Sequence, residues 1–175
     1  MVPALIATSN PGVRLRFAKQ GDAALVLAFI QELAEYEQLP DDVEADAEML
    51  ADTLFGEMPD AEVVIAEVEG APAGFALFFH NYSTFLGRRG LHLEDLFVRP
   101  AFRGKGIGRV LMTYLAKLAV ERGCGRFEWS VLDWNTPAID FYRSLGARGM
   151  DEWTAQRVSG PALHALAEQF DSAIH

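Results

Sequence analysis

The chain has 175 residues and a mass of 19.3 kDa, the length of one domain. Half of the residues are apolar, so a core can form without disulfides, and the single cysteine, Cys124, allows no intrachain disulfide. The net charge of −10 argues against nucleic-acid binding, and no apolar run is long enough to span a membrane. The four histidines lack the spacing of metal ligands. We expect one cytoplasmic domain over residues 1–175 with no nucleic-acid, membrane or metal partner.

Periodicity and turn residues place the elements along the chain. Alternating apolar and basic residues predict a strand at 13–18, and an apolar stripe after Gly21-Asp22 predicts a helix at 24–37. Further strands are expected at 63–68, 74–79, 91–98, 127–132 and 154–158, and further helices at 46–55, 107–123, 137–145 and 161–170. This order predicts an α/β fold, with a mixed, mostly antiparallel sheet of about six to seven strands and helices on both faces.

Charge is unevenly distributed. Residues 20–87 contain no Lys or Arg, although they hold more than half of the acidic residues. Farther along, a basic run without acids contains Arg99, Arg103, Lys105 and Arg109. Two interpretations explain this pattern equally well. One is an ordinary solvated surface, and the other is an acidic half that attracts a cation beside a basic loop that holds an anion.

The loop between the strand at 91–98 and the helix at 107–123 is the most informative stretch. Gly104, Gly106 and Gly108 leave backbone N–H groups unobstructed at a helix start, which favours phosphate binding. The spacing fits neither a P-loop, which needs Ser or Thr after Gly-Lys, nor a dinucleotide fold. A tight turn without a ligand is the alternative.

Four separated motifs point to one family. Arg103-x-x-Gly106-x-Gly108 resembles the acetyl-CoA loop of the GNAT superfamily of N-acetyltransferases. The accompanying stretches at 33–37, 93–98, 132–135, 140–142 and 145–147 are similar to the diamine acetyltransferase family, which includes spermidine/spermine and thialysine N-acetyltransferases. The resemblance covers about 13–158, leaving residues 1–12 as an extension and a C-terminal helix at 160–171 outside it.

The resemblance implies an acetyl-CoA site beside a splayed sheet. Its pantetheine contacts match Leu96, Phe97 and Val98. Its pyrophosphate contacts match Arg103, Gly104, Lys105, Gly106, Ile107, Gly108 and Arg109. Asn135 matches a position near the thiol end, and a role as a helix cap is compatible with it.

Acetylation of an amine needs a base for the ammonium and an acid for the departing thiolate. The resemblance implies Glu94 as the base, acting through water, and Tyr142 as the acid. The alternatives are that Tyr142 only packs in the apolar stripe of its helix and that Glu94 or Asp95 is a structural acid at a strand end. Strand alternation places Asp95 on the opposite face from Glu94. The residues implied to line the amine site are Tyr36, Glu37, Glu94, Asp95 and Glu152.

One position separates the branches of the family. Ser83 stands where the polyamine-acetylating members carry an acidic residue, which favours the thialysine branch. We expect an acetyl-CoA-dependent N-acetyltransferase acting by direct transfer on a lysine-like amino acid or short diamine. A polyamine acetyltransferase, a non-catalytic acyl-CoA sensor and a general phosphate-ligand binder are the alternatives. The resemblance also implies a homodimer.

Overall fold

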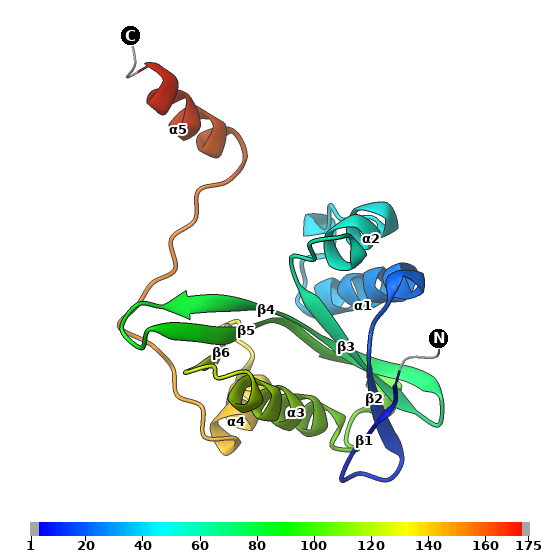
Figure 1. Cartoon of the computed structure of the whole chain (residues 1–175). Helices are drawn as coiled ribbons and strands as arrows, with labels where there is room; N and C mark the ends of the chain where they lie inside the picture. Colours follow the sequence, from blue (N-terminus) through cyan, green and yellow to red (C-terminus); the bar gives the residue numbers. More distant parts are fainter. Residues whose placement is uncertain (1–3, 173–175) are drawn as a thin grey trace. The chain divides into compact units, whose positions relative to one another are not determined.

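The computed structural model describes residues 4–172. These residues form two compact units, one ending at Ser130 and the other beginning at Val131, and each is described by itself. The first unit contains the whole sheet and three α-helices (Figure 1). The second contains two α-helices and an extended segment between them. The prediction of one domain over 1–175 stays a prediction.

The sheet has six strands in the order of the chain. They are β1 (Ile6–Ala7), β2 (Val13–Phe17), β3 (Glu62–Val68), β4 (Ala71–Ser83), β5 (Arg88–Val98) and β6 (Phe127–Trp129). Neighbouring strands are antiparallel except β5 and β6, which are parallel. Glu69 and Gly70 form the turn that joins β3 to β4. Both adopt positive φ, at 50° and 82°, as a tight two-residue hairpin turn requires. The predicted mixed, mostly antiparallel sheet is therefore confirmed.

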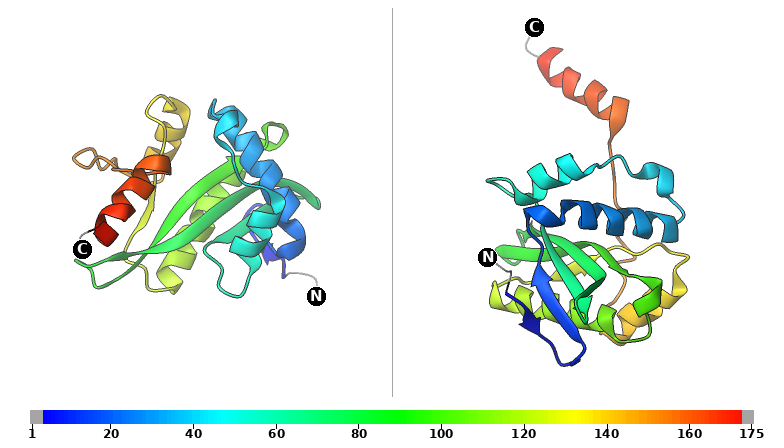
Figure 2. Two further views of the ribbon diagram at one scale, coloured as in Figure 1. Left: turned by 90° about the horizontal axis from the view of Figure 1, so that it is seen from above. Right: turned by 90° about the vertical axis from the view of Figure 1, so that its right-hand side faces the viewer.

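Helices cover both faces of the sheet in the first unit, as the sequence predicts. The elements α1 (Ala23–Tyr36) and α2 (Ala47–Phe55) lie on one face, and α3 (Ile107–Glu121) lies on the other (Figure 2). The core beneath α1 and α2 includes Phe29, Ile65, Phe75 and Phe97, all buried. Phe29 and Phe75 stack with ring centroids 5.1 Å apart, so α1 is packed tightly onto β4.

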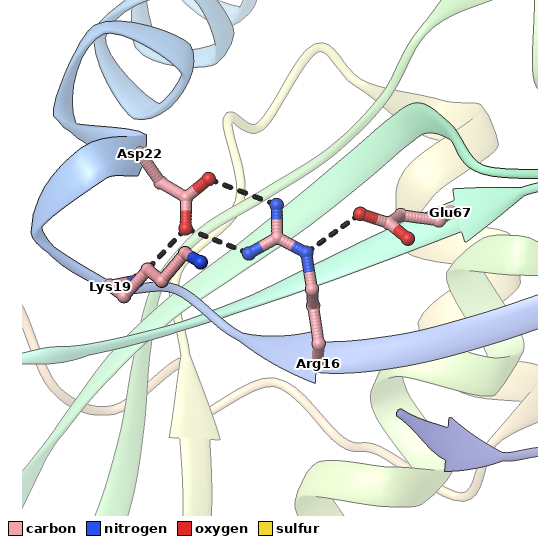
Figure 3. Close-up of polar contacts among 4 residues, drawn as sticks. All are labelled: Arg16, Lys19, Asp22 and Glu67. Atoms are coloured by element: carbon pink, nitrogen blue, oxygen red, sulfur yellow. Dashed lines mark hydrogen bonds and ion pairs between the residues drawn. The ribbon is translucent and has the colours of Figure 1, made fainter. Parts of the chain in front are cut away.

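The amino-terminal end of α1 is held by a buried ion-pair network (Figure 3). The Arg16 guanidinium donates to both carboxylate oxygens of Asp22, at 2.7 and 2.9 Å, and its Nε donates to Glu67 Oε1 at 2.7 Å. The backbone N–H of Lys19 donates to the same Asp22 carboxylate at 2.9 Å. These contacts join β2 and β3 to the start of α1. They therefore fix this end of the helix on the sheet.

The second unit contains α4 (Thr136–Ser144) and α5 (Gly160–Ser172). The strand predicted at 154–158 is wrong, because residues 153–159 form no regular element in the structure. These residues are exposed, so the apolar positions of the pattern bury nothing. The predicted strand at 127–132 ends earlier, at Trp129. No helix among residues 4–172 combines the length and the apolar composition needed to cross a membrane.

Candidate active site

A β-bulge in β5 brings two acidic residues to one face of the sheet. Leu77 of β4 pairs with Asp95 and the next β4 residue pairs with Leu93, so Glu94 is an extra residue in the ladder. Asp95 lies opposite Leu77, which packs against the core beneath α1. Glu94 Oε2 lies 3.6 Å from Nε2 of His92, on the same face. The prediction that Asp95 points to the opposite face from Glu94 is therefore wrong, because the bulge interrupts the alternation.

A third carboxyl group joins this pair from the carboxyl-terminal end of α1. Glu37, the residue after Tyr36, contributes together with Glu94 to the negative potential at Asp95. Burial raises the pKa of Asp95 to about 6, and the charges of Glu94 and Glu37 act in the same direction. Burial also raises the pKa of Glu37. A site that concentrates negative charge in this way favours a cation such as an ammonium group.

Arg103 connects this cluster to the glycine loop. Its guanidinium lies 5.0 Å from the ring centroid of Tyr36 and 5.6 Å from that of Phe97, and its Nε donates to the Val98 carbonyl at 3.0 Å. Tyr36 is partly exposed beside it. Arg103 thus holds the end of β5 against the end of α1, and the carbonyl of Val98 is engaged by this contact.

The glycine loop is open and exposed. Gly104 and Gly106 have left-handed φ angles of 76° and 77°, and an added Cβ at either would meet no atom within 4 Å. Gly106 is the N-cap of α3, and Val110 makes the first backbone bond back to it, so the preceding N–H groups of the helix point into the loop without a helical partner. This geometry and the exposed side chain of Lys105 fit a phosphate group.

Not every predicted cofactor residue presents its side chain. Ile107 and Phe97 are buried at 2% and 5% exposure, so only their backbone groups can meet a ligand. The basic residues predicted as one run do not act together in the structure. Arg99 pairs with both carboxylate oxygens of Glu32 on α1, at 2.8 and 3.0 Å. Arg99 therefore stabilises the packing of β5 on α1 instead of contributing charge to the loop.

The sheet separates beside the loop. Strand β6 pairs with β5 only from Leu91 to Leu93, whereas β5 continues to Val98. Within residues 4–130, the outer edge of β5 beyond Leu93 is not covered by β6. The predicted pantetheine contacts at Leu96, Phe97 and Val98 lie along that open edge, so the residues present fit an extended arm that leads from the loop.

The second unit holds the remaining predicted residues. Asn135 caps α4, its side-chain oxygen accepting from the Ala138 N–H at 3.3 Å, as the sequence predicts. Tyr142 is half-buried, with its ring 5.5 Å from that of Phe141. Glu152 is exposed. The roles of Tyr142, Asn135 and Glu152 in a site shared with the first unit stay predictions.

The structure adds detail at His92, beside the carboxyl cluster, and at Ser83, at the other end of the β4–β5 hairpin. The sequence predicts no role for His92 in the site, and the structure places its ring against Phe79 with its Nε2 facing Glu94. The sequence signal was its position two residues before Glu94, since residues at i and i+2 share a strand face. Ser83 is buried, and its hydroxyl accepts from the Leu86 N–H at 3.2 Å within the β4–β5 turn.

Comparison with known proteins agrees with this geometry. The chain is 41% identical over 166 residues to the thialysine N-epsilon-acetyltransferase of Sus scrofa, covering 89% of this chain and 97% of the relative. It is 33% identical over 198 residues to the L-ornithine N5-acetyltransferase of Arabidopsis thaliana, covering 87% of each. A solved integron cassette protein from the mobile metagenome of V. cholerae superposes with a TM-score of 0.76 at 30% identity, covering 90% of this chain and 98% of that one. The acetyltransferase (GNAT) family model matches residues 27–147, and the chain belongs to this family of acetyltransferase enzymes.

Proposed function

We propose that this enzyme transfers the acetyl group of acetyl-CoA to a primary amine of a small molecule, either a lysine-like amino acid such as thialysine or a short diamine. The observation that carries the proposal is the carboxyl cluster of Glu37, Glu94 and Asp95 at the end of α1 beside an open glycine loop. The names of the relatives support the same acceptor class, because they include thialysine and ornithine acetyltransferases.

The amine arrives as an ammonium ion, with a pKa of about 10.4, and must lose a proton before it attacks the thioester. In the proposed mechanism the carboxylate of Glu94 takes that proton through water. The residues that we propose for the amine site are Asp95, Glu37, Tyr36 and Glu152.

Acetyl-CoA supplies the activated thioester, and its pyrophosphate would lie on the N–H groups from Gly104 to Arg109. The pantetheine arm would follow Leu96 to Val98, and Asn135 would lie near the thiol end. Tyr142 would protonate the departing thiolate, so that the acetyl group passes directly to the amine. We further propose that the enzyme is a cytoplasmic homodimer.

The test is the release of CoA thiol from acetyl-CoA with thialysine, lysine, ornithine, putrescine, spermidine and spermine, beside an acceptor-free control. Thiol release with a small amine above the control is the expected result. Preference for spermidine would favour the polyamine branch. No release with any amine, combined with tight CoA binding, would contradict the proposal and favour an acyl-CoA sensor, and competition by ATP would favour a general phosphate-ligand binder.

Variants then test the assigned roles. Glu94→Gln and Tyr142→Phe should each lower kcat by about 10²-fold or more, because each removes one proton transfer. Their matched controls are Glu35→Gln, an exposed acid on α1, and Tyr82→Phe, an exposed tyrosine of β4. Both controls should retain the activity of the unmodified enzyme. An unchanged kcat in Glu94→Gln or in Tyr142→Phe would remove that residue from the mechanism.

A further inference from the structure

The His92 ring lies next to Glu94 on the same face of β5. Its Nε2 is 3.6 Å from Glu94 Oε2, within ion-pair distance. Glu94 is the more accessible of the two, with 56% of its side chain exposed against 25% for His92. The proposed base therefore has a second, less exposed proton-accepting group beside it.

Packing from the neighbouring strands orients this histidine. The ring of Phe79 on β4 lies 4.9 Å from it at an angle of 34°. On the other side, Glu128 of β6 is the register partner of His92, and it also receives contacts from Asn81 Nδ2 at 3.5 Å and Arg126 Nε at 3.4 Å. The contact with Phe79 holds the ring on the face of the sheet where its Nε2 meets Glu94.

The charged groups around His92 come from three elements. Glu94 and Asp95 lie on its own strand, and Glu37 at the end of α1 acts on Asp95. Glu128, with Arg126 beside it, lies on β6. Glu94 therefore lies next to the ring along β5, and Glu128 is its register partner on β6.

We propose that His92 is a positioning residue for Glu94, orienting its carboxylate and taking over the proton that Glu94 removes from the ammonium group. This inference rests on the proposed function. In the first step the ammonium N–H bond breaks, and the proton moves through water to the Glu94 carboxylate, leaving a neutral amine and a carboxylic acid. In the second step the acid proton moves to the lone pair of His92 Nε2, which restores the carboxylate and leaves an imidazolium that later releases the proton to solvent.

The chemistry gives a reason for the second acceptor. A carboxylate, with an ordinary pKa of about 4.3, is a poor base for an ammonium with a pKa of about 10.4. An imidazole, with an ordinary pKa of about 6.5, lies closer to the ammonium and retains the proton better once it has moved. Transfer to His92 then restores the Glu94 carboxylate without giving the proton back to the amine, which would reverse the first step.

The kinetic test uses His92→Gln and His92→Ala. His92→Gln should lower kcat about tenfold with the KM for the amine unchanged. In His92→Ala the same loss should be largely reversed by added imidazole, which a purely structural role would not produce. The matched control is His80→Ala, because His80 is a strand histidine near Arg122 on the opposite face. It should show neither the loss nor any response to imidazole. A kcat in His92→Gln within twofold of the unmodified enzyme, or a loss that imidazole leaves unchanged, would overturn the proposal.

A second measurement needs no acetyl transfer. In the ¹⁵N NMR spectrum of the free protein, Glu94→Gln should shift the Nε2 resonance of His92, identified by its absence in His92→Gln, while Glu35→Gln should leave it in place. An unshifted resonance would overturn the His92–Glu94 pair even in an active enzyme. A clear shift in a protein that acetylates no amine would instead locate the failure in the proposed function.

Discussion

The two ends of α1 place carboxyl groups in opposite electrostatic situations. At the amino-terminal end, Asp22 is 8% exposed and paired on both oxygens with Arg16. At the carboxyl-terminal end, Asp95 is also shielded from solvent, and within residues 4–130 neither it nor Glu37 forms an ion pair with a lysine or arginine. Its charged neighbours are the acids Glu94 and Glu37. Burial is common to both ends, and the sign of the neighbouring charge differs.

The pKa values follow this difference. The hydrogen bonds from Arg16 lower the pKa of Asp22 against the opposing effect of burial, and the same contacts raise the pKa of Arg16. Burial raises the pKa of Asp95 to about 6, and the neighbouring carboxylates reinforce the shift. One end of α1 therefore uses charge to stabilise the fold, whereas the other holds charge that the fold alone does not satisfy. Unsatisfied charge of this kind is typical of a binding or catalytic site.

The largest expected effect is at the paired end. Asp22→Asn should lower the free energy of unfolding by about 3 kcal/mol at pH 7, because it leaves the guanidinium of Arg16 buried without its main partner. Since the folded-state pKa of Asp22 lies below its unfolded value, this stabilisation is present above the unfolded pKa and is lost as the pH falls through the folded pKa. Urea denaturation of the variant and the unmodified protein, from pH 7 down through the pKa of Asp22, measures the loss of stability and its dependence on pH.

Lys117→Met is the matched control for that variant. Lys117 and Glu121 form an exposed i,i+4 pair on α3 with 71% and 58% of their side chains accessible. Loss of this ion pair should change the free energy of unfolding by less than about 0.5 kcal/mol. Equal effects of the two substitutions would contradict the special role of the buried network.

The same substitution at the other end should have the opposite sign. Asp95→Asn should raise the free energy of unfolding by about 1 to 3 kcal/mol at pH 8, because it removes a charge that burial and two acidic neighbours oppose. The folded-state pKa lies above the unfolded value, so the penalty appears as the pH rises from about 4 toward 6 and is complete above that. The gain should vanish at pH 3, where the carboxyl is protonated in both states. Urea denaturation at pH 8 and pH 3 measures it.

The gain in stability should be accompanied by weaker amine binding. Under the proposed function, Asp95→Asn raises the KM for the amine while the affinity for CoA is unchanged. A variant that is destabilised at pH 8, with an unchanged KM, would place Asp95 in the fold instead of the site.

The sequence pointed to the acidic end of α1, but it predicted neither the paired end nor the geometry of the acidic cluster. The strand and helix positions follow from periodicity, and the resemblance pointed to Glu37, Glu94 and Asp95 together. The bulge at Glu94 was not predictable, because nothing in Leu93-Glu94-Asp95-Leu96 departs from an ordinary strand; it arises only when β5 pairs with β4. Likewise, the strand expected at 154–158 needed a neighbour to pair with, and pairing is not a local property of the sequence.

The smallest expected effect is the coupling within the acidic end. Because Glu37 contributes to the raised pKa of Asp95, Glu37→Gln should reduce the stability gained from Asp95→Asn by about 0.5 kcal/mol in a double-mutant cycle at pH 8. Glu35→Gln, two residues back on the exposed side of α1, is the matched control, and its effect should be additive with that of Asp95→Asn. Additivity in both cycles would mean that Glu37 does not raise the pKa of Asp95, and the acidic end of α1 would then owe the shift to burial and Glu94.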